Sequence, residues 1–118
     1  MGELYRFSRH NRLKSAMIRS VLSQSRRVNG MIFQVAGSVN NDNLPCLAVI
    51  VTRKVAKRAV DRNYARRVVR EVFRKQQHAL DSVSFVVRVK KRLVKGSYTS
   101  AAYELEQLFD KLVTCLAS

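Results

Sequence analysis

The sequence feature that most constrains the fold is an arginine-rich segment, residues 62–74, which follows the apolar residues 46–52. Residues 62–74 (RNYARRVVREVFR) repeat their apolar side chains at the spacing of an α-helix. On a helical wheel these apolar side chains cluster within about 140°, and the arginines fall within about 100° on the far side. The buried set is expected to be Ala65, Val68, Val69, Val72 and Phe73. The segment therefore predicts a helix that packs its valine face on a sheet and exposes its guanidinium groups.

Three segments around this helix predict strands. Residues 31–39 and 82–89 alternate in polarity, which is typical of half-buried strands, and Asn29–Gly30 indicates a turn before the first of them. In the second, Val86 is expected on the outward face together with Ser84 and Arg88. Residues 46–52 (CLAVIVT) are continuously apolar, which predicts a central strand covered on both faces.

Two further helices are expected, one on each side of this region. Residues 16–24 carry apolar side chains at helical spacing after a suitable N-cap, Ser15. A longer apolar stripe follows Ser97, which can cap the last helix. The predicted order is α-β-β-α-β-α in one domain over residues 1–118. The fold class is α+β, an α/β sandwich with helices packed on a small mixed sheet.

The charge of the chain points to a polyanionic partner. The formal net charge is +15 and the isoelectric point is about 11.0. Such a charge destabilises a compact state unless a polyanion neutralises it, which favours a nucleic acid. An anionic membrane surface is the alternative, but it requires a basic amphipathic helix with bulky insertion residues or an anchor. The sequence shows neither clearly, so we expect no membrane partner.

The cysteines and the N-terminal segment predict a cytoplasmic protein. Cys46 and Cys115 lie in apolar runs, as expected for buried, reduced thiols. The first residues are basic but precede no apolar run, so they do not resemble a secretory signal. No segment approaches the length of about eighteen apolar residues that a membrane span needs.

The sequence argues against a self-sufficient nuclease. Metal-assisted cleavage of a phosphodiester needs clustered carboxylates, and the eight acidic residues are scattered. Asp61 and Glu71 lie among arginines, which favours ion pairs, with Arg67 and Lys75 one turn from Glu71. His10 and His78 are far apart in the sequence, the cysteines lack metal-ligand spacing, and no glycine-rich phosphate loop occurs. We therefore expect no catalytic residue in this chain.

Residues 57–74 (KRAVDRNYARRVVREVFR) resemble the RNR signature of the bacterial ribonuclease P protein subunit. The signature is typically written A-V-x-R-N-x-x-K-R-x-x-R-E-x-F-R. The matching positions here are Ala59, Val60, Arg62, Asn63, Arg66, Arg67, Arg70, Glu71, Phe73 and Arg74, with Arg66 where lysine is common. The preceding strand and the following "TRK" (residues 52–54) are similar to the family's entry into this helix. Counting the flanking elements, the resemblance spans nearly the whole chain.

The resemblance implies a ribonucleoprotein enzyme whose chemistry resides in its RNA. The family's protein subunit binds a large catalytic RNA, and the complex removes the 5′ leader from precursor tRNA with Mg²⁺ ions. No cofactor is expected on the protein alone, and a monomer is expected to bind the RNA one to one. The family fold also contains a left-handed β-α-β crossover.

Two groups of site residues follow from the resemblance. Those expected to contact the catalytic RNA are Arg58, Arg62, Asn63, Arg66, Arg67, Arg70 and Arg74. Those expected in or beside a cleft for the single-stranded leader, between the first helix and the sheet, are Arg12, Lys14, Ile18, Leu22, Phe33, Arg53, Lys54 and Lys57. Ile18, Leu22 and Ala36 occupy positions that are often aromatic in the family, so leader binding is expected to depend more on phosphate contacts and apolar packing.

Two other functions fit a small basic chain. A ribosomal protein would bind ribosomal RNA permanently and would not prefer substrates with a leader. A DNA-binding helix-turn-helix is disfavoured because the basic helix follows a strand instead of a partner helix.

Overall fold

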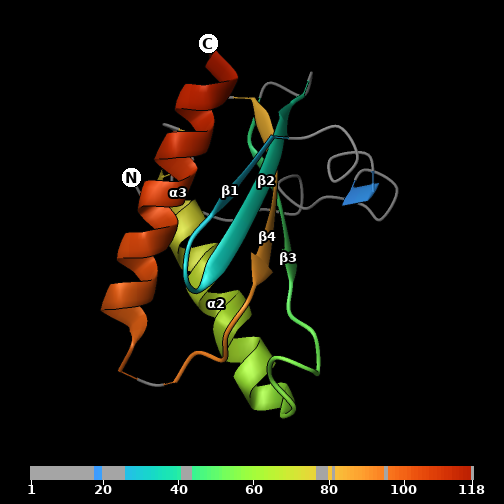
Figure 1. Ribbon diagram of the computed structural model, residues 1–118, viewed down its shortest axis with the longest axis vertical. Coiled ribbons are helices and arrows are strands. Elements are labelled where there is room, and N and C mark those ends of the chain that lie inside the picture. The colour runs from blue at the N-terminus through green and yellow to red at the C-terminus, as the bar shows by residue number, and fades with distance from the viewer. Residues whose placement is uncertain are drawn as a thin grey trace.

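The structure is a computed structural model, and it describes residues 18–19, 26–40, 44–76, 80, 82–94 and 96–117. Its elements, in chain order, are β1 (Arg26–Asn29), β2 (Phe33–Val39), β3 (Cys46–Ile50), α2 (Ala59–Gln76), β4 (Val83–Val89) and α3 (Tyr98–Ala117). The strands form one mixed sheet in the order β1-β2-β4-β3, and both helices cover the same face of it (Figure 1). The predicted α+β class with a small mixed sheet is confirmed.

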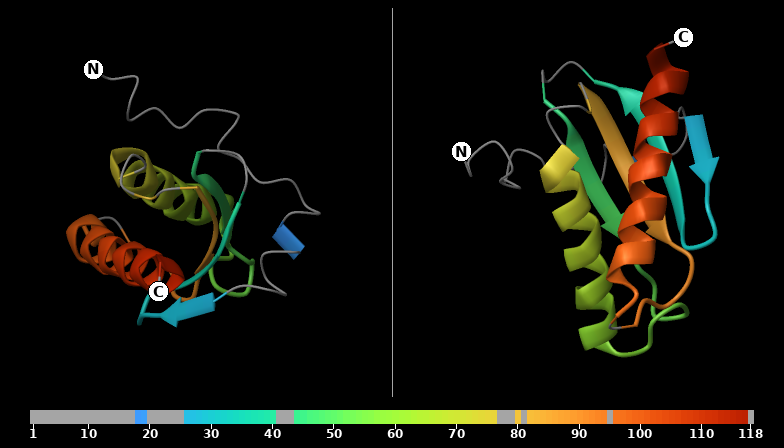
Figure 2. Two further views of the ribbon diagram at one scale, coloured as in Figure 1. Left: turned by 90° about the horizontal axis from the view of Figure 1, so that it is seen from above. Right: turned by 90° about the vertical axis from the view of Figure 1, so that its left-hand side faces the viewer.

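The connection from β3 through α2 to β4 is a left-handed crossover. β3 and β4 are parallel, with Leu47 opposite Phe85. In the right-hand view of Figure 2 the helices face the viewer, both strands run downward, and β4 lies to the right of β3. This is the rare hand for a β-α-β unit. It agrees with the crossover that the family resemblance implied.

The predicted order of elements lacks one strand, β1. β1 pairs antiparallel with β2, and Val28 lies opposite Val35. Its sequence, RRVN, has one apolar residue and therefore no alternation that could indicate a strand. The turn at Asn29–Gly30, predicted to precede the first strand, instead joins two strands, and the Gly30 N–H donates to the Phe33 carbonyl at 2.8 Å.

The prediction that residues 46–52 form the central strand is wrong, because β3 lies at the edge of the sheet. The interior strand next to it is β4, where Ser84 and Val86 are 2% and 1% exposed on the face away from the helices. Cys46 and Val86 form a small cluster on this face, with Ile18 packed against it. A continuous apolar run thus indicates a strand whose two faces are both at least partly covered. It does not show that the strand lies in the interior of the sheet.

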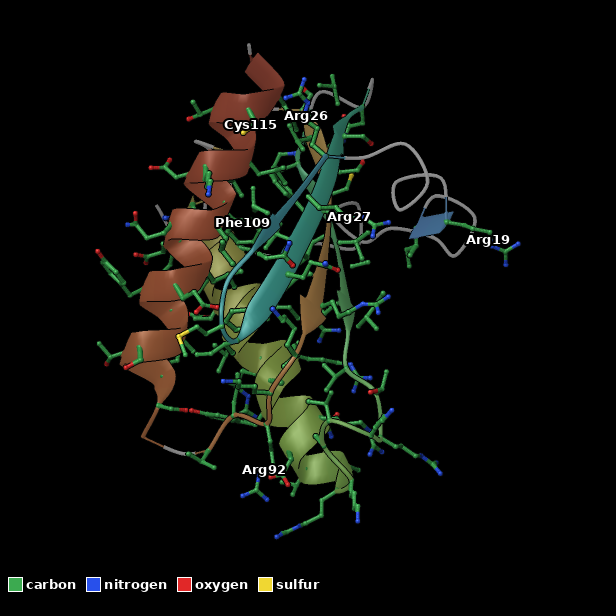
Figure 3. The ribbon with its side chains drawn as sticks, in the orientation of Figure 1. Arg19, Arg26, Arg27, Arg92, Phe109 and Cys115 are labelled. Carbon is green, nitrogen blue, oxygen red and sulfur yellow. The ribbon has the colours of Figure 1, made fainter. Side chains whose placement is uncertain are left out.

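The helix-covered face of the sheet carries the main core. All five residues predicted for the apolar face of α2 are buried. Phe73 from α2, Phe85 from β4 and Phe109 from α3 are fully buried and meet there, with ring centroids 5.0 Å apart for Phe85 and Phe109. Phe109 points from α3 toward the sheet (Figure 3). Burial of three aromatic side chains in edge-on and tilted contacts joins the two helices to the sheet.

A carboxylate on α3 holds the turn between β1 and β2. The Glu104 side chain accepts hydrogen bonds from the N–H groups of Met31, Ile32 and Phe33 at 3.0, 2.8 and 2.9 Å. A Cβ at Gly30 would lie 2.6 Å from this carboxyl group, so a side chain there would displace it. Lys90 donates from its Nζ to the Gly30 carbonyl at 2.8 Å. The turn is therefore fixed to α3 by charge-assisted hydrogen bonds.

We expect Glu104→Ala to lower the free energy of unfolding by about 2–3 kcal/mol, because it leaves two partly buried N–H groups without this acceptor. Asp110→Ala removes an exposed acid from the same helix and should change that free energy by less than about 0.5 kcal/mol. Urea denaturation monitored by circular dichroism measures both. Equal stabilities of the two variants would show that the contacts of Glu104 contribute nothing.

Candidate RNA-binding site

The exposed face of α2 forms a shallow basic hollow of about 390 Å³. It is lined by Asn63, Arg66, Arg67, Arg70, Glu71 and Arg74. The predicted grouping of these arginines on one side of the helix is confirmed. Their contact with RNA stays a prediction. Because a planar guanidinium binds phosphate oxygens in a bidentate manner, several of them on one helix face suit a folded RNA backbone.

Two contacts inside this face orient its side chains. Arg74 donates two hydrogen bonds to the Glu71 carboxylate, and these bonds lower the pKa of Glu71 below its ordinary value. Arg66 reaches the Asn63 Oδ1 atom at 3.4 Å, at the long end of the hydrogen-bond range. The prediction that Glu71 is ion-paired is confirmed, but its partner is Arg74, three residues on, and not Arg67 or Lys75. Glu71 thus offsets one positive charge at the far end of the hollow.

Arg62 has a structural contact that sequence reasoning missed. Its Nη1 atom donates to the carbonyl oxygens of Ala56 and Lys57 at 3.0 and 2.9 Å. The guanidinium is therefore directed at the segment that enters α2 and does not line the basic hollow. No pattern in the sequence could indicate this contact, because the acceptors are main-chain atoms.

The segment between β3 and α2 is a tight turn that displays four predicted cations. The Thr52 carbonyl accepts hydrogen bonds from the N–H groups of Val55 and Ala56, and Ala56 is buried. The exposed cations of this segment are Arg53, Lys54, Lys57 and Arg58. They gather beside the N-terminal end of α2, where the helix dipole adds to the positive potential.

The residues predicted for the leader cleft do not all share one surface. Ile18 lies on the sheet face away from the helices, in contact with the cluster of Ala36, Cys46 and Val86, and Figure 3 shows Arg19 beside it on the same side. Phe33 is fully buried in the core on the opposite face, so the prediction that it lines the cleft is wrong. Alternation along β2 separates it from Ala36. The remaining predicted residues, Arg12, Lys14 and Leu22, lie outside the described part of the chain.

Two arginines on the Ile18 side of the sheet were not predicted as site residues. Arg27 lies opposite Ala36, and Arg88 lies opposite Gln34, so strand alternation places both on the Ile18 side. Both are exposed. The sequence places Arg88 on this face through the alternation of residues 82–89, but Arg27 lies in the strand that was not predicted.

Comparison with known proteins identifies the family. Residues 7–113 match the family described as Ribonuclease P. The chain belongs to the ribonuclease P protein family. A relative from Chromobacterium violaceum, named Ribonuclease P protein component, is 42% identical over 115 residues, which cover 97% of this chain and 95% of the relative. A relative of the same name from Vibrio vulnificus is 37% identical over 109 residues, covering 92% and 89%.

Solved structures of this family share the fold. A ribonuclease P protein from Staphylococcus aureus superposes with a TM-score of 0.67 at 18% identity, covering 89% of this chain and 94% of that one. The ribonuclease P protein from Thermotoga maritima gives a TM-score of 0.65 at 20% identity, covering 86% and 94%. This chain therefore shares its fold with these solved ribonuclease P proteins.

Family membership assigns the biochemical role. The chain is a protein subunit of an endoribonuclease that matures the 5′ ends of tRNA, and its partner is ribonuclease P RNA. Within the described residues, no three His, Cys, Asp or Glu side chains lie close enough together to hold a metal ion. None of the described helices is long and apolar enough to cross a membrane. Cys46 is buried and Cys115 is half-buried.

The contacts of Arg62 and Arg66 predict different effects on stability. Arg62→Ala should lower the free energy of unfolding by about 1–2 kcal/mol, because it removes a charged donor from two carbonyl groups. Arg66→Ala should change that free energy by less than about 0.5 kcal/mol, since it removes only the long contact to Asn63. Urea denaturation of the two variants tests the assignment. If Arg62→Ala is as stable as the unaltered chain, its contacts with the turn are not structural.

Proposed function

We propose that the chain binds the catalytic RNA of ribonuclease P through the exposed face of α2. The single observation that carries this proposal is the row of arginines on one rigid helix face, lining one basic hollow. Phosphates placed among these side chains neutralise their mutual repulsion. Each phosphate contact also releases condensed counterions, which makes the affinity depend steeply on salt.

The 5′ leader of precursor tRNA is proposed to bind on the face of the sheet that holds Ile18. This surface joins partly exposed apolar side chains, such as Ala48 and Ile50, to the exposed Arg27 and Arg88. The turn with Arg53 and Lys54 begins three residues after Ile50 and supplies cations at one end. A surface with cations at its edges and apolar side chains between them suits a single strand with a charged backbone.

The protein is proposed to act by electrostatics, while the RNA and its Mg²⁺ ions perform the hydrolysis. Cations between two RNA molecules screen the repulsion of their backbones, which raises substrate affinity and lowers the Mg²⁺ concentration required. We propose one protein chain per RNA and a monomer when free. The cytoplasmic location stays a prediction, as does the absence of a cofactor on the protein alone.

Replacement of Arg66 and Arg70 by Ala should weaken binding to the catalytic RNA and lower the slope of log K against log[salt] by up to about two. The measurement is a titration of RNA with protein at several salt concentrations. Lys111→Ala, which removes an exposed cation of α3, serves as the control and should leave the slope unchanged. An unaltered slope in the double variant would show that these two side chains do not contact phosphate.

Addition of the protein should allow the catalytic RNA to cleave precursor tRNA at a lower Mg²⁺ concentration.

Replacement of Arg53 and Lys54 by Ala should reduce the preference of the complex for precursor over mature tRNA by roughly three- to tenfold, because it removes contacts with phosphates of the leader. Binding of the catalytic RNA should change little, since these residues lie outside the α2 hollow. The leader assignment is wrong if the double variant keeps the full preference.

A further inference from the structure

A second hollow, on the other side of α3 from the α2 arginines, has no part in the site described so far. Its volume is about 700 Å³, and the β1–β2 turn, the segment after β4 and the first turns of α3 enclose it. The side chains that matter for its chemistry are Met31, Lys91, Tyr103 and Glu104. Met31 is 71% exposed and Tyr103 is 65% exposed. Two large, mostly exposed side chains therefore lie together on this hollow, where a partner could cover both.

The hollow is rigid because Glu104 lies in its wall. The three hydrogen bonds from main-chain N–H groups to the Glu104 carboxylate fix the turn that carries Met31 to the helix that carries Tyr103. Lys90 holds the same turn through the Gly30 carbonyl. A flat ligand that packs on Tyr103 and Met31 therefore meets a surface that is already ordered, and little conformational entropy is lost when it binds.

The charges around the hollow favour a nucleotide. Lys91 is exposed and lines the hollow, and its neighbours Lys90 and Arg92 are exposed cations of the same segment. Its acid, Glu104, accepts three hydrogen bonds from main-chain N–H groups, and the next acid along α3, Glu106, does not line the hollow. An aromatic ring beside a basic side chain is an arrangement by which proteins hold unpaired nucleotides, with the base stacked on the ring and the phosphate near the cation.

The hollow is connected to the basic face of α2. Arg92 lies 3.8 Å from the Asp61 carboxylate, Nη1 to Oδ2, and Figure 3 shows it at the end of the molecule where α2 begins. Leu93 lines a third hollow of about 340 Å³ together with Asn63 and Arg67, which also line the α2 hollow. The segment after β4 thus joins the two surfaces, so an RNA on α2 can continue toward Lys91.

We propose that an unpaired nucleotide of the catalytic RNA binds in this hollow, with its base on Tyr103 and Met31 and a phosphate beside Lys91. The proposal rests on the proposed function of α2, because the catalytic RNA is chosen for its continuity with that surface. It adds a second contact to the same RNA, on the other side of α3 from the arginines of α2.

Fluorescence of an introduced tryptophan tests the contact directly. The chain contains no tryptophan, so Tyr103→Trp creates a single reporter. Val39→Trp is the matched control, because Val39 is as exposed as Tyr103, at 65%. Val39 lies at the last residue of β2, whereas Met31 in the hollow lies before the first, so the control is at the opposite end of the strand. On addition of the catalytic RNA alone, we expect the reporter of the Tyr103→Trp variant to be quenched and protected from acrylamide. The reporter of the Val39→Trp variant should stay accessible.

Affinity measurements provide the second readout. Tyr103→Ala should weaken binding of the catalytic RNA by roughly five- to a hundredfold, as for loss of one stacked base, and Tyr103→Phe should restore most of the affinity. Lys91→Ala should lower the salt slope by about one, and Lys111→Ala should leave it unchanged.

The outcomes separate this proposal from the function of α2. If the tryptophan at position 103 stays accessible in a saturated complex whose affinity still depends on Arg66 and Arg70, the hollow is not an RNA contact and the proposed function stands. If this tryptophan is protected only after precursor tRNA is added, the assignment to the catalytic RNA is wrong. If the unaltered chain does not bind the catalytic RNA, the proposed function itself fails.

Discussion

Burial of the apolar face of α2 against the sheet is the constraint on which the rest of the structure depends. Val68, Val69, Val72 and Phe73 are each at most 2% exposed, so the helix cannot rotate about its axis without exposing them. The same rotation determines where the arginines point. Charges of one sign on a flexible segment would spread apart, but on this helix they are held together. The energy of the core therefore maintains an array that electrostatics alone would disperse.

Three of the acidic residues that the structure describes have partners within the chain itself. Glu104 binds three main-chain N–H groups, Glu71 pairs with Arg74, and Asp61 lies beside Arg92. Each of these acids contributes to local geometry, and all eight acids of the chain offset only part of its 23 Lys and Arg charges, which leaves a net charge of +15. The positive potential consequently remains at the surface, available to a polyanion. A chain with as many acids as bases would be more stable by itself and a poorer ligand for RNA.

Features that depend on local periodicity could be predicted from the sequence. Features that depend on contacts between residues far apart in the sequence could not. The buried and exposed faces of α2 follow from a 3.6-residue repeat, and both were predicted correctly. β1 was missed because its pairing with β2, and not its composition, makes it a strand. The position of β3 at the edge, and the burial of Phe33 on the helix side, depend on sheet order and register. The contacts of Glu104 join residues more than seventy positions apart.

Parallel pairing of β3 and β4 explains why the cations of two separate segments gather at one end of the molecule. The carboxyl ends of parallel strands meet at the same edge of a sheet, so the turn after β3 and the segment after β4 emerge together. The first displays Arg53 and Lys54, and the second displays Lys91 and Arg92. α2 begins at the same edge, and its dipole presents a partial positive charge there. An antiparallel arrangement of these two strands would place the basic segments at opposite ends, and no continuous path could lead from α2 to the Tyr103 hollow.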